Sequence, residues 1–83
     1  MIHAKWDGMR LTVCEDGLRV AEGKVEISDG DYFLFMDEKN EYGDLVVRMM
    51  IRKIYNMGGY RQYVNAQENN TGFYERYGFE YIN

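Results

Sequence analysis

Apolar and polar residues alternate along the first third of the chain, and this alternation predicts β-strands. Residues 10–14 form one such segment, and residues 18–27 form either one long strand or two strands with a bulge at Gly23. Glu15-Asp16-Gly17 lies between them. Asp-Gly favours a hairpin because glycine accepts a positive φ. We expect the terminus around His3 to be frayed.

Residues 32–36, Tyr-Phe-Leu-Phe-Met, are apolar on both faces, which predicts a central strand covered on both sides. A turn at residues 28–31 separates this segment from the preceding strand. The connections are too short for crossovers. The pattern therefore predicts an antiparallel meander of three or four strands.

The period of the pattern changes after the polar loop at residues 37–43. From Asp44 to Met57 the apolar residues recur at helical spacing, and Gly58-Gly59 provides a left-handed stop. The apolar stripe consists of Val46, Val47, Met50, Ile51, Ile54 and Tyr55. This segment is predicted to be a helix of about 14 residues.

The remaining segments predict a strand at residues 60–66, a short helix at residues 72–77 and a last short strand at residues 79–82. A strand–helix–strand order implies a crossover between parallel strands. The expected fold class is α+β: an antiparallel β-meander, a βαβ crossover with a parallel strand pair, and a short C-terminal helix and strand. Residues 1–83 are expected to form a single domain.

Composition narrows the possible classes of protein. The 83 residues are 46% hydrophobic and 16% aromatic, which is typical of a folded chain and not of a disordered one. The longest apolar run, residues 33–36, is far below the roughly 20 residues of a membrane-spanning helix. We therefore expect a cytoplasmic protein without a membrane partner. One cysteine and one histidine, Cys14 and His3, cannot form a disulfide or a zinc site, so no metal is expected.

The charge is unevenly distributed. The net charge of −4 argues against a nucleic-acid partner, because such domains need a basic surface. Residues 1–44 have 11 acidic and 5 basic side chains, whereas residues 45–83 have 3 acidic and 5 basic ones. The C-terminal half is the better place for an anionic ligand. Alternatively, Arg48, Arg52 and Lys53 form only a solvated helix face.

The segment Phe73-Tyr74-Glu75-Arg76-Tyr77-Gly78-Phe79 resembles the C-terminal signature of the GNAT acyltransferase superfamily, in which an Asn-rich loop precedes a helix reading Phe-Tyr-Glu-Lys-x-Gly-Phe. Asn69-Asn70-Thr71 fits the preceding loop. The resemblance covers roughly residues 18–83 and is strongest at residues 63–80. It implies acetyl-CoA as cofactor and an amine as acceptor, either a small molecule or a protein amine.

The resemblance also assigns roles to individual residues. In the family, a splayed strand binds the pantetheine arm and the start of the next helix binds the pyrophosphate, where unpaired N–H groups favour an anion. The cofactor-binding positions carried over are Phe35, Met36, Asp37, Tyr42, Gly43, Asp44, Leu45 and Asn70. Tyr74 occupies the position of the general acid that protonates the leaving thiolate.

Each assignment has a structural alternative. Tyr74 is either the general acid or a core aromatic, and Gly43 is either the phosphate turn or the start of a helix. Asn70 either contacts the coenzyme or caps the last helix. The acidic residues of the loop, Asp37, Glu38 and Glu41, could include a base toward the amine or be simply solvated.

The chain departs from the family pattern at three places. The segment between Asn65 and Phe73 is a few residues shorter than is usual in the family, so the last helix is expected to be clipped or displaced. The loop at residues 40–45 keeps one glycine and has Asn40 at the basic or amide anchor. The N-terminal strand and two helices of the acceptor side are expected to be missing. The sequence thus predicts a minimal acetyl-CoA-dependent N-acyltransferase; alternatively, it is a non-catalytic interaction module that lost coenzyme binding. A homodimer could supply the missing wall of the site.

Overall fold

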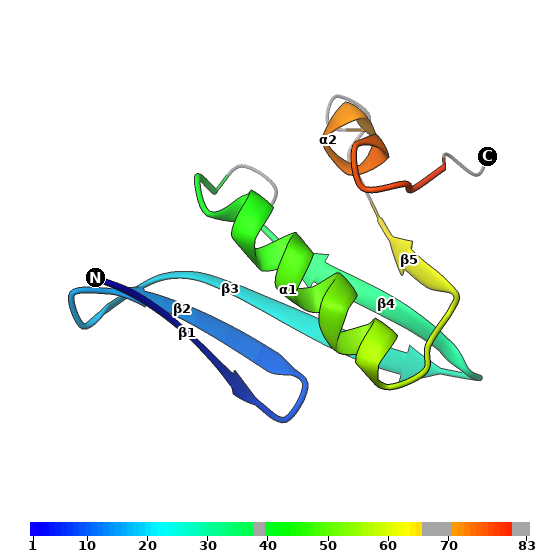
Figure 1. Cartoon of the computed structure of the whole chain (residues 1–83), viewed down its shortest axis with the longest axis horizontal. Coiled ribbons are helices and arrows are strands. Elements are labelled where there is room, and N and C mark those ends of the chain that lie inside the picture. The colour runs from blue at the N-terminus through cyan, green and yellow to red at the C-terminus, as the bar shows by residue number, and fades with distance from the viewer. Residues whose placement is uncertain (38–39, 66–70, 81–83) are drawn as a thin grey trace.

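Five strands form one mixed sheet, and a long helix lies across one of its faces (Figure 1). The computed structural model describes residues 1–37, 40–65 and 71–80. The elements are β1 (Ile2–Asp7), β2 (Arg10–Glu15), β3 (Leu18–Ser28), β4 (Asp31–Met36), α1 (Gly43–Asn56), β5 (Gln62–Val64) and α2 (Thr71–Glu75). The strands lie in the sheet in the order of the sequence.

The connections confirm the predicted α+β class. Strands β1 to β4 pair antiparallel through short turns, and β5 pairs parallel to β4 after the α1 crossover. The predicted helix from Asp44 to Met57 agrees with α1 to within one residue at each end. Four residues of the predicted stripe are buried against the sheet, namely Val46, Val47, Met50 and Ile54. Ile51 is half-buried, and the prediction is wrong for Tyr55, which is 69% exposed.

The predicted frayed N-terminus is wrong, because β1 pairs with β2 along its whole length, from Ile2 opposite Glu15 to Asp7 opposite Arg10. The first residues therefore form a fully paired strand, β1. It is joined to β2 by a tight turn in which Gly8 has a φ of +60°. Alternation of Ile2, Ala4 and Trp6 with polar residues is the sequence signal that identifies this strand.

Strand β3 is continuous, and its bulge lies at Val20 and not at Gly23. Val13 pairs with Ala21 while Cys14 pairs with Arg19, so that one extra β3 residue is accommodated between them. Gly23 serves packing instead. A Cβ atom there would lie 2.8 Å from Met50 Sδ and 2.8 Å from Val46 Cγ1, so the absence of a side chain lets α1 approach the sheet closely.

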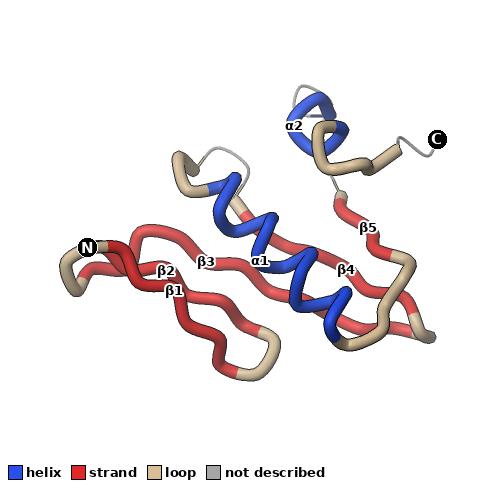
Figure 2. Tube along the Cα trace, in the orientation of Figure 1, coloured by secondary structure: helices blue, strands red, loops and turns tan. Residues whose placement is uncertain are grey.

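The core lies between α1 and one face of the sheet. Its buried side chains are Leu11, Val13, Ala21, Val25, Leu34, Val46, Val47, Met50, Ile54 and Tyr74. The prediction that β4 is covered on both faces is wrong, since Phe35 on the opposite face remains 43% exposed. Figure 2 shows α1 on one side of the strands only. The second apolar face of β4 instead supports a cross-strand pair, in which Phe33 stacks on Tyr63 with ring centroids 5.4 Å apart.

The C-terminal segment agrees only in part with the prediction. Helix α2 is present, but Phe79 and Glu80 are not in a strand, and the rest of the predicted strand lies outside the described residues. Phe79 packs edge-on against Tyr74 instead, with centroids 6.0 Å apart. Neither described helix has the length and apolar character needed to cross a bilayer.

Candidate functional site

The parallel ladder between β4 and β5 is short and opens toward the C-terminal ends of both strands. Pairing runs from Tyr32–Gln62 to Leu34–Val64, whereas β4 continues to Met36. Figure 1 shows β5 beside the start of β4 only. Phe35 and Met36 thus keep their β3 partners, Lys24 and Gly23, but have no β5 partner. We call this end of the ladder, after Leu34 and Val64, the opening between β4 and β5; the backbone groups of Phe35 and Met36 do not pair with β5 there.

The turn before α1 is held by Asn40. Its side-chain Nδ2 donates to the carbonyl of Val20 at 2.7 Å, and its Oδ1 accepts from the backbone N–H of Tyr42 at 2.8 Å. The backbone N–H of Gly43 donates to the carbonyl of Asn40 at 3.0 Å. Asn40, the predicted amide anchor for a phosphate, therefore fastens the turn to β3 with its side chain.

Gly43 begins α1 and is buried beneath α2. A Cβ atom at this position would lie 3.3 Å from Phe73 Cζ and 3.4 Å from Met36 Cε. The close approach of the Phe73 ring explains the need for a small residue. Gly43 thus marks a helix start and a packing contact, and the neighbouring Leu45 is half-buried.

Asp44, in the first turn of α1, accepts hydrogen bonds from two side chains. The Tyr77 hydroxyl donates to its carboxylate, and Arg48 Nε donates at 3.0 Å. These two bonds hold the pKa of the Asp44 carboxyl below its usual value, with the bond from Tyr77 the larger cause. Burial and the Asp44 carboxylate together raise the pKa of the Tyr77 phenol.

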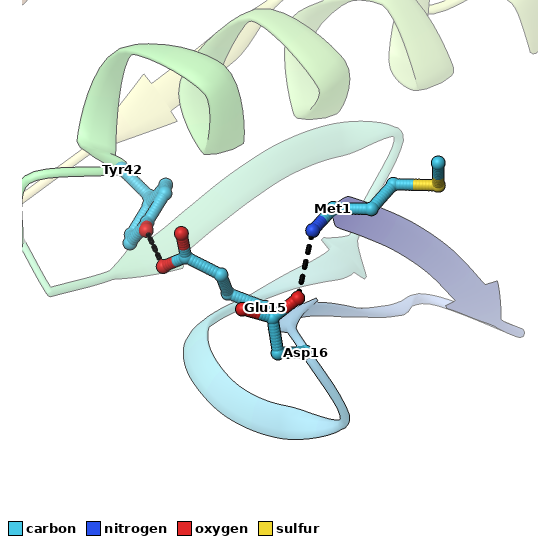
Figure 3. Close-up of polar contacts among 4 residues, drawn as sticks. All are labelled: Met1, Glu15, Asp16 and Tyr42. Carbon is cyan, nitrogen blue, oxygen red and sulfur yellow. Dashed lines mark hydrogen bonds and ion pairs between the residues drawn. The ribbon is translucent and has the colours of Figure 1, made fainter.

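Tyr42 connects the same turn to the β2–β3 hairpin. Its hydroxyl donates to the carboxylate of Glu15 (Figure 3), which raises the pKa of Tyr42 to about 12. Next to it, the Met1 amine forms an ion pair with Asp16 at 2.8 Å (Figure 3). The negative charge of Glu15 disfavours a second negative charge on the phenol, so Tyr42 stays a hydrogen-bond donor at neutral pH.

Tyr74 lies in the core and is only 2% exposed. Its ring meets the ring of Phe73 edge-on, with centroids 5.0 Å apart, in addition to its contact with Phe79. The core-aromatic alternative therefore describes its packing. Of the other predicted positions, Asp37 is exposed just after β4, and Asn70 lies outside the described residues.

Two arginines join this region beyond the predicted cofactor positions. Arg76 lies over the Phe73 ring, with its guanidinium carbon 5.3 Å from the centroid, and Arg48 lies over the Tyr77 ring at 5.6 Å. The ion pair between Asp44 and Arg48 could be found from the sequence, because residues four apart in a helix lie next to each other. Arg76 follows directly after α2, so no local pattern places it next to α1. In the described part of the chain, no group of three His, Cys, Asp or Glu side chains could hold a metal ion.

Comparison with known proteins gives a likeness in structure alone. The chain matches no family model, and no curated protein matches it in sequence. Its fold matches an acetyltransferase from Trypanosoma brucei with a TM-score of 0.69 and 15% sequence identity. The match covers 89% of this chain and 63% of that one, so this chain spans less than two thirds of its length. The fold is therefore GNAT-like, as the Phe73–Phe79 segment predicted.

Proposed function

We propose that this chain, which has the fold of an acetyltransferase, binds an acyl-coenzyme A thioester in the opening between β4 and β5. The observation that carries the proposal is the end of the parallel ladder at Leu34–Val64, two residues before β4 itself ends. The backbone groups of Phe35, Met36 and Asp37 would bind the pantetheine arm, as the family resemblance implies. The likeness in fold to an acetyltransferase supports an acyl-coenzyme A as the class of ligand.

The proposed reaction is acyl transfer to an amine, either a small molecule or a protein amine. A backbone N–H of residues 35–37 polarises the thioester carbonyl, and the amine attacks the carbonyl carbon. A C–N bond forms, the C–S bond breaks, and the thiolate takes a proton from the Tyr74 hydroxyl. The amine loses its proton to water, and a proton from the solvent returns to the Tyr74 phenolate. Because Tyr74 is enclosed by Phe73 and Phe79, this step requires the thiol end of the coenzyme to enter the inner end of the opening.

Binding is tested by thermal unfolding with and without excess acetyl-CoA. A ligand at about 100 times its dissociation constant stabilises the folded state by about 2.7 kcal/mol. For a domain of this size, that corresponds to an increase of the midpoint on the order of 10 °C. No change of the midpoint at millimolar acetyl-CoA would contradict the proposal.

The acid role of Tyr74 is tested by Tyr74→Phe, which keeps the ring in the core. We expect the thermal shift with acetyl-CoA to persist and turnover with an amine acceptor to fall by about 10²- to 10⁴-fold. Tyr60→Phe is the matched control, because Tyr60 is 90% exposed. Equal turnover by Tyr74→Phe and the unsubstituted protein would contradict the acid role and show that Tyr74 serves only in packing.

A non-catalytic interaction module is the second candidate function. The observation that favours it is the start of α1, where the Phe73 ring covers Gly43 and Asp44 holds a negative charge beside the expected pyrophosphate position. The exposed Glu41 adds a second negative charge. This candidate predicts no stabilisation by any acyl-CoA. If a homodimer completes the acceptor side, the rate of acyl transfer per chain should instead rise with protein concentration, because only the dimer has a whole site.

A further inference from the structure

Strand β1 forms one outer edge of the sheet, with β2 beside it (Figure 1). The turn between the two strands has two residues, and Asp7 pairs with Arg10 directly next to it. In a hairpin of this kind the closing pair exchanges two backbone hydrogen bonds, and bonded pairs then alternate along the strands. The Asp16 N–H donates to the carbonyl of Met1 at 3.3 Å, which agrees with this alternation. The odd-numbered residues of β1 therefore bond to β2.

The even-numbered residues of β1 direct their backbone N–H and C=O groups away from β2. They are Ile2, Ala4 and Trp6, and no strand in the described part of the chain pairs with them from outside. Their side chains lie on the face of the sheet on which α1 packs, because Ala4 pairs with the core residue Val13. Whereas Val13 has no exposed surface, Ile2 is 47% exposed and Ala4 is exposed as well. Outward backbone groups and partly covered apolar side chains thus meet at one edge.

Strand β1 lacks two of the features that commonly protect a sheet edge from a second chain. These features are proline, a bulge and charged side chains. The chain contains no proline, and β1 pairs with β2 without a shift of register. Lys5 and Asp7 are charged, but their side chains lie on the face away from α1. Another strand can therefore approach this edge, and the charges restrict only the register in which it pairs.

We infer that a second copy of this chain pairs with the outer edge of β1, antiparallel and with the two Ala4 residues opposite each other, so that two sheets join into one. In this register Ile2 lies opposite Trp6 of the second copy. Each pair of even-numbered residues then exchanges two backbone hydrogen bonds. The inference does not rest on the proposed function, because β1 and β5 are opposite edges of the sheet.

The residues of β1 favour a second copy in this register. A twofold axis at Ala4 places the smallest side chain of the strand opposite itself and, on each side of it, pairs a β-branched residue with an aromatic one, which is a favourable cross-strand pair. An axis at Lys5 would place two like charges opposite each other, which is unfavourable. An axis at Trp6 would require Gly8 to pair as a strand residue, although its φ of +60° belongs to the turn. Because β1 is complementary to itself, we favour a second copy over an unrelated strand.

The dimer is tested by sedimentation equilibrium of the full chain. One pair of short strands buries less than the roughly 1,200–2,000 Å² of a stable interface, so we expect half of the chains to be dimeric only at about 0.1 mM. The chain should therefore be mainly monomeric at about 10 µM and mainly dimeric at about 1 mM. A chain that remains monomeric at about 1 mM would overturn the inference.

Amide hydrogen exchange with water identifies the surface that dimerises. The outward amide protons of Ala4 and Trp6 become hydrogen-bonded in the dimer, so their exchange should slow about fourfold between about 10 µM and about 1 mM protein. The amide protons of Lys5 and Asp7 bond to β2 in both states and should change much less. If dimers form while Ala4 and Trp6 exchange as fast as in dilute protein, another surface pairs and the inference is wrong.

Proline at Ala4 tests the hydrogen bonds of the edge. Ala4→Pro removes an outward N–H and no bond between β1 and β2, and proline is tolerated at such positions of edge strands. We expect it to raise the dissociation constant of the dimer at least about tenfold, because the two central bonds are lost. Ala4→Ser keeps the N–H and is the matched control, which should still dimerise. Equal dimerisation of the two variants would overturn the inference.

A second variant covers the case in which Ala4→Pro does not fold, as judged by its thermal midpoint. Ala4→Lys places two like charges opposite each other at the axis and should also prevent dimerisation. Its matched control is Leu18→Lys, which adds the same charge at a 72% exposed position of β3 and should leave the dimer intact. Loss of the dimer in both lysine variants would show a general charge effect and contradict the pairing at Ala4.

Acetyl-CoA separates this inference from the proposed function. Because β1 and β5 are opposite edges, Ala4→Pro should show the same thermal shift with acetyl-CoA as the unsubstituted chain. If the unsubstituted chain dimerises through β1 but acetyl-CoA stabilises neither protein, the proposed function is wrong and the pairing stands. If acetyl-CoA stabilises both proteins and neither dimerises, the pairing is wrong and coenzyme binding stands.

Discussion

Single hydrogen bonds fix the turn before α1 to the sheet, and the bond from Tyr42 to Glu15 is one that a titration can follow. The phenol of Tyr42 loses its proton only near pH 12 in the folded chain, against about 10 for a free tyrosine. Because the pKa is raised on folding, the bond stabilises the protein fully below pH 10. This contribution disappears as the pH rises through 12.

We expect Tyr42→Phe to lower the unfolding midpoint by a constant amount below pH 10. The difference from the unsubstituted protein should then shrink between pH 10 and 12, as the phenol ionises next to the Glu15 carboxylate. Thermal unfolding across this range measures it. Tyr60→Phe, at a 90% exposed position, should leave the midpoint unchanged throughout. A difference between Tyr42→Phe and the unsubstituted protein that does not change up to pH 12 would contradict the bond.

At the level of elements, helix α1 is positioned by two glycines. Gly23 lets its first half approach β3, and Gly59 lets the chain turn back toward β5 after its end. A Cβ atom at Gly59 would lie 2.6 Å from Ile54 Cγ2 and 2.6 Å from Tyr32 Cε2. Neither atom is the free end of a long flexible side chain, so the added methyl group must displace a core helix or a strand.

Gly59→Ala should therefore destabilise the protein by about 1–3 kcal/mol, the range for overpacking a core. Gly72→Ala in α2 is the matched control, because no atom lies within 4 Å of the added Cβ. It should be neutral or slightly stabilising, since alanine favours helices. Denaturant unfolding gives both free energies. Equal values for the two variants would show that the contact at Gly59 relaxes at little cost.

The elements were predictable from sequence wherever their pattern is local. The apolar stripe of α1 and the alternation of β2 and β3 each lie within one segment, and their positions agree with the structure. Strand β1 was not predicted although Ile2, Ala4 and Trp6 alternate with polar residues, because chain termini are commonly frayed and the pairing with β2 that orders this one is a contact between segments. The sequence also did not predict that one face of β4 is open. A run of apolar residues arises either when a second layer covers the strand or when its aromatic side chains pair with those of the next strand, as Phe33 does with Tyr63.

The sequence identified the segments that form the candidate site, but not the contacts between them. The Phe73–Phe79 segment indicated the GNAT-like fold, and the structural likeness supports it. The contact of Tyr77 with Asp44 joins residues 33 positions apart, and no periodicity encodes such a distance. The same holds for Phe73 over Gly43. These contacts follow from the packing of α2 on α1, which a single sequence does not reveal.

For the whole molecule, the core between α1 and the strands β2, β3 and β4 is expected to be the most stable part. These strands contribute the buried residues Leu11, Val13, Ala21, Val25 and Leu34. In contrast, β5 has three residues and α2 has five. A short strand with one neighbour and a single helical turn open at low free energy.

Native-state amide hydrogen exchange should therefore show the slowest exchange in β2, β3 and β4, and the fastest among the described elements in β5 and α2. Acetyl-CoA should slow exchange in β5, since a ligand between β4 and β5 stabilises both strands. Protection of α2 equal to that of β3 before any ligand is added would contradict this order.

The most direct test of the central claim is to map acetyl-CoA binding on the amide resonances of the whole chain. The account predicts shifts at residues 35–37 and at residues 63–65, on the two sides of the opening after Leu34 and Val64. It also predicts unchanged resonances along the outer strand β1, which is separated from β4 by β2 and β3. Shifts confined to other parts of the sheet, or no shifts at millimolar acetyl-CoA, would contradict a coenzyme site between β4 and β5.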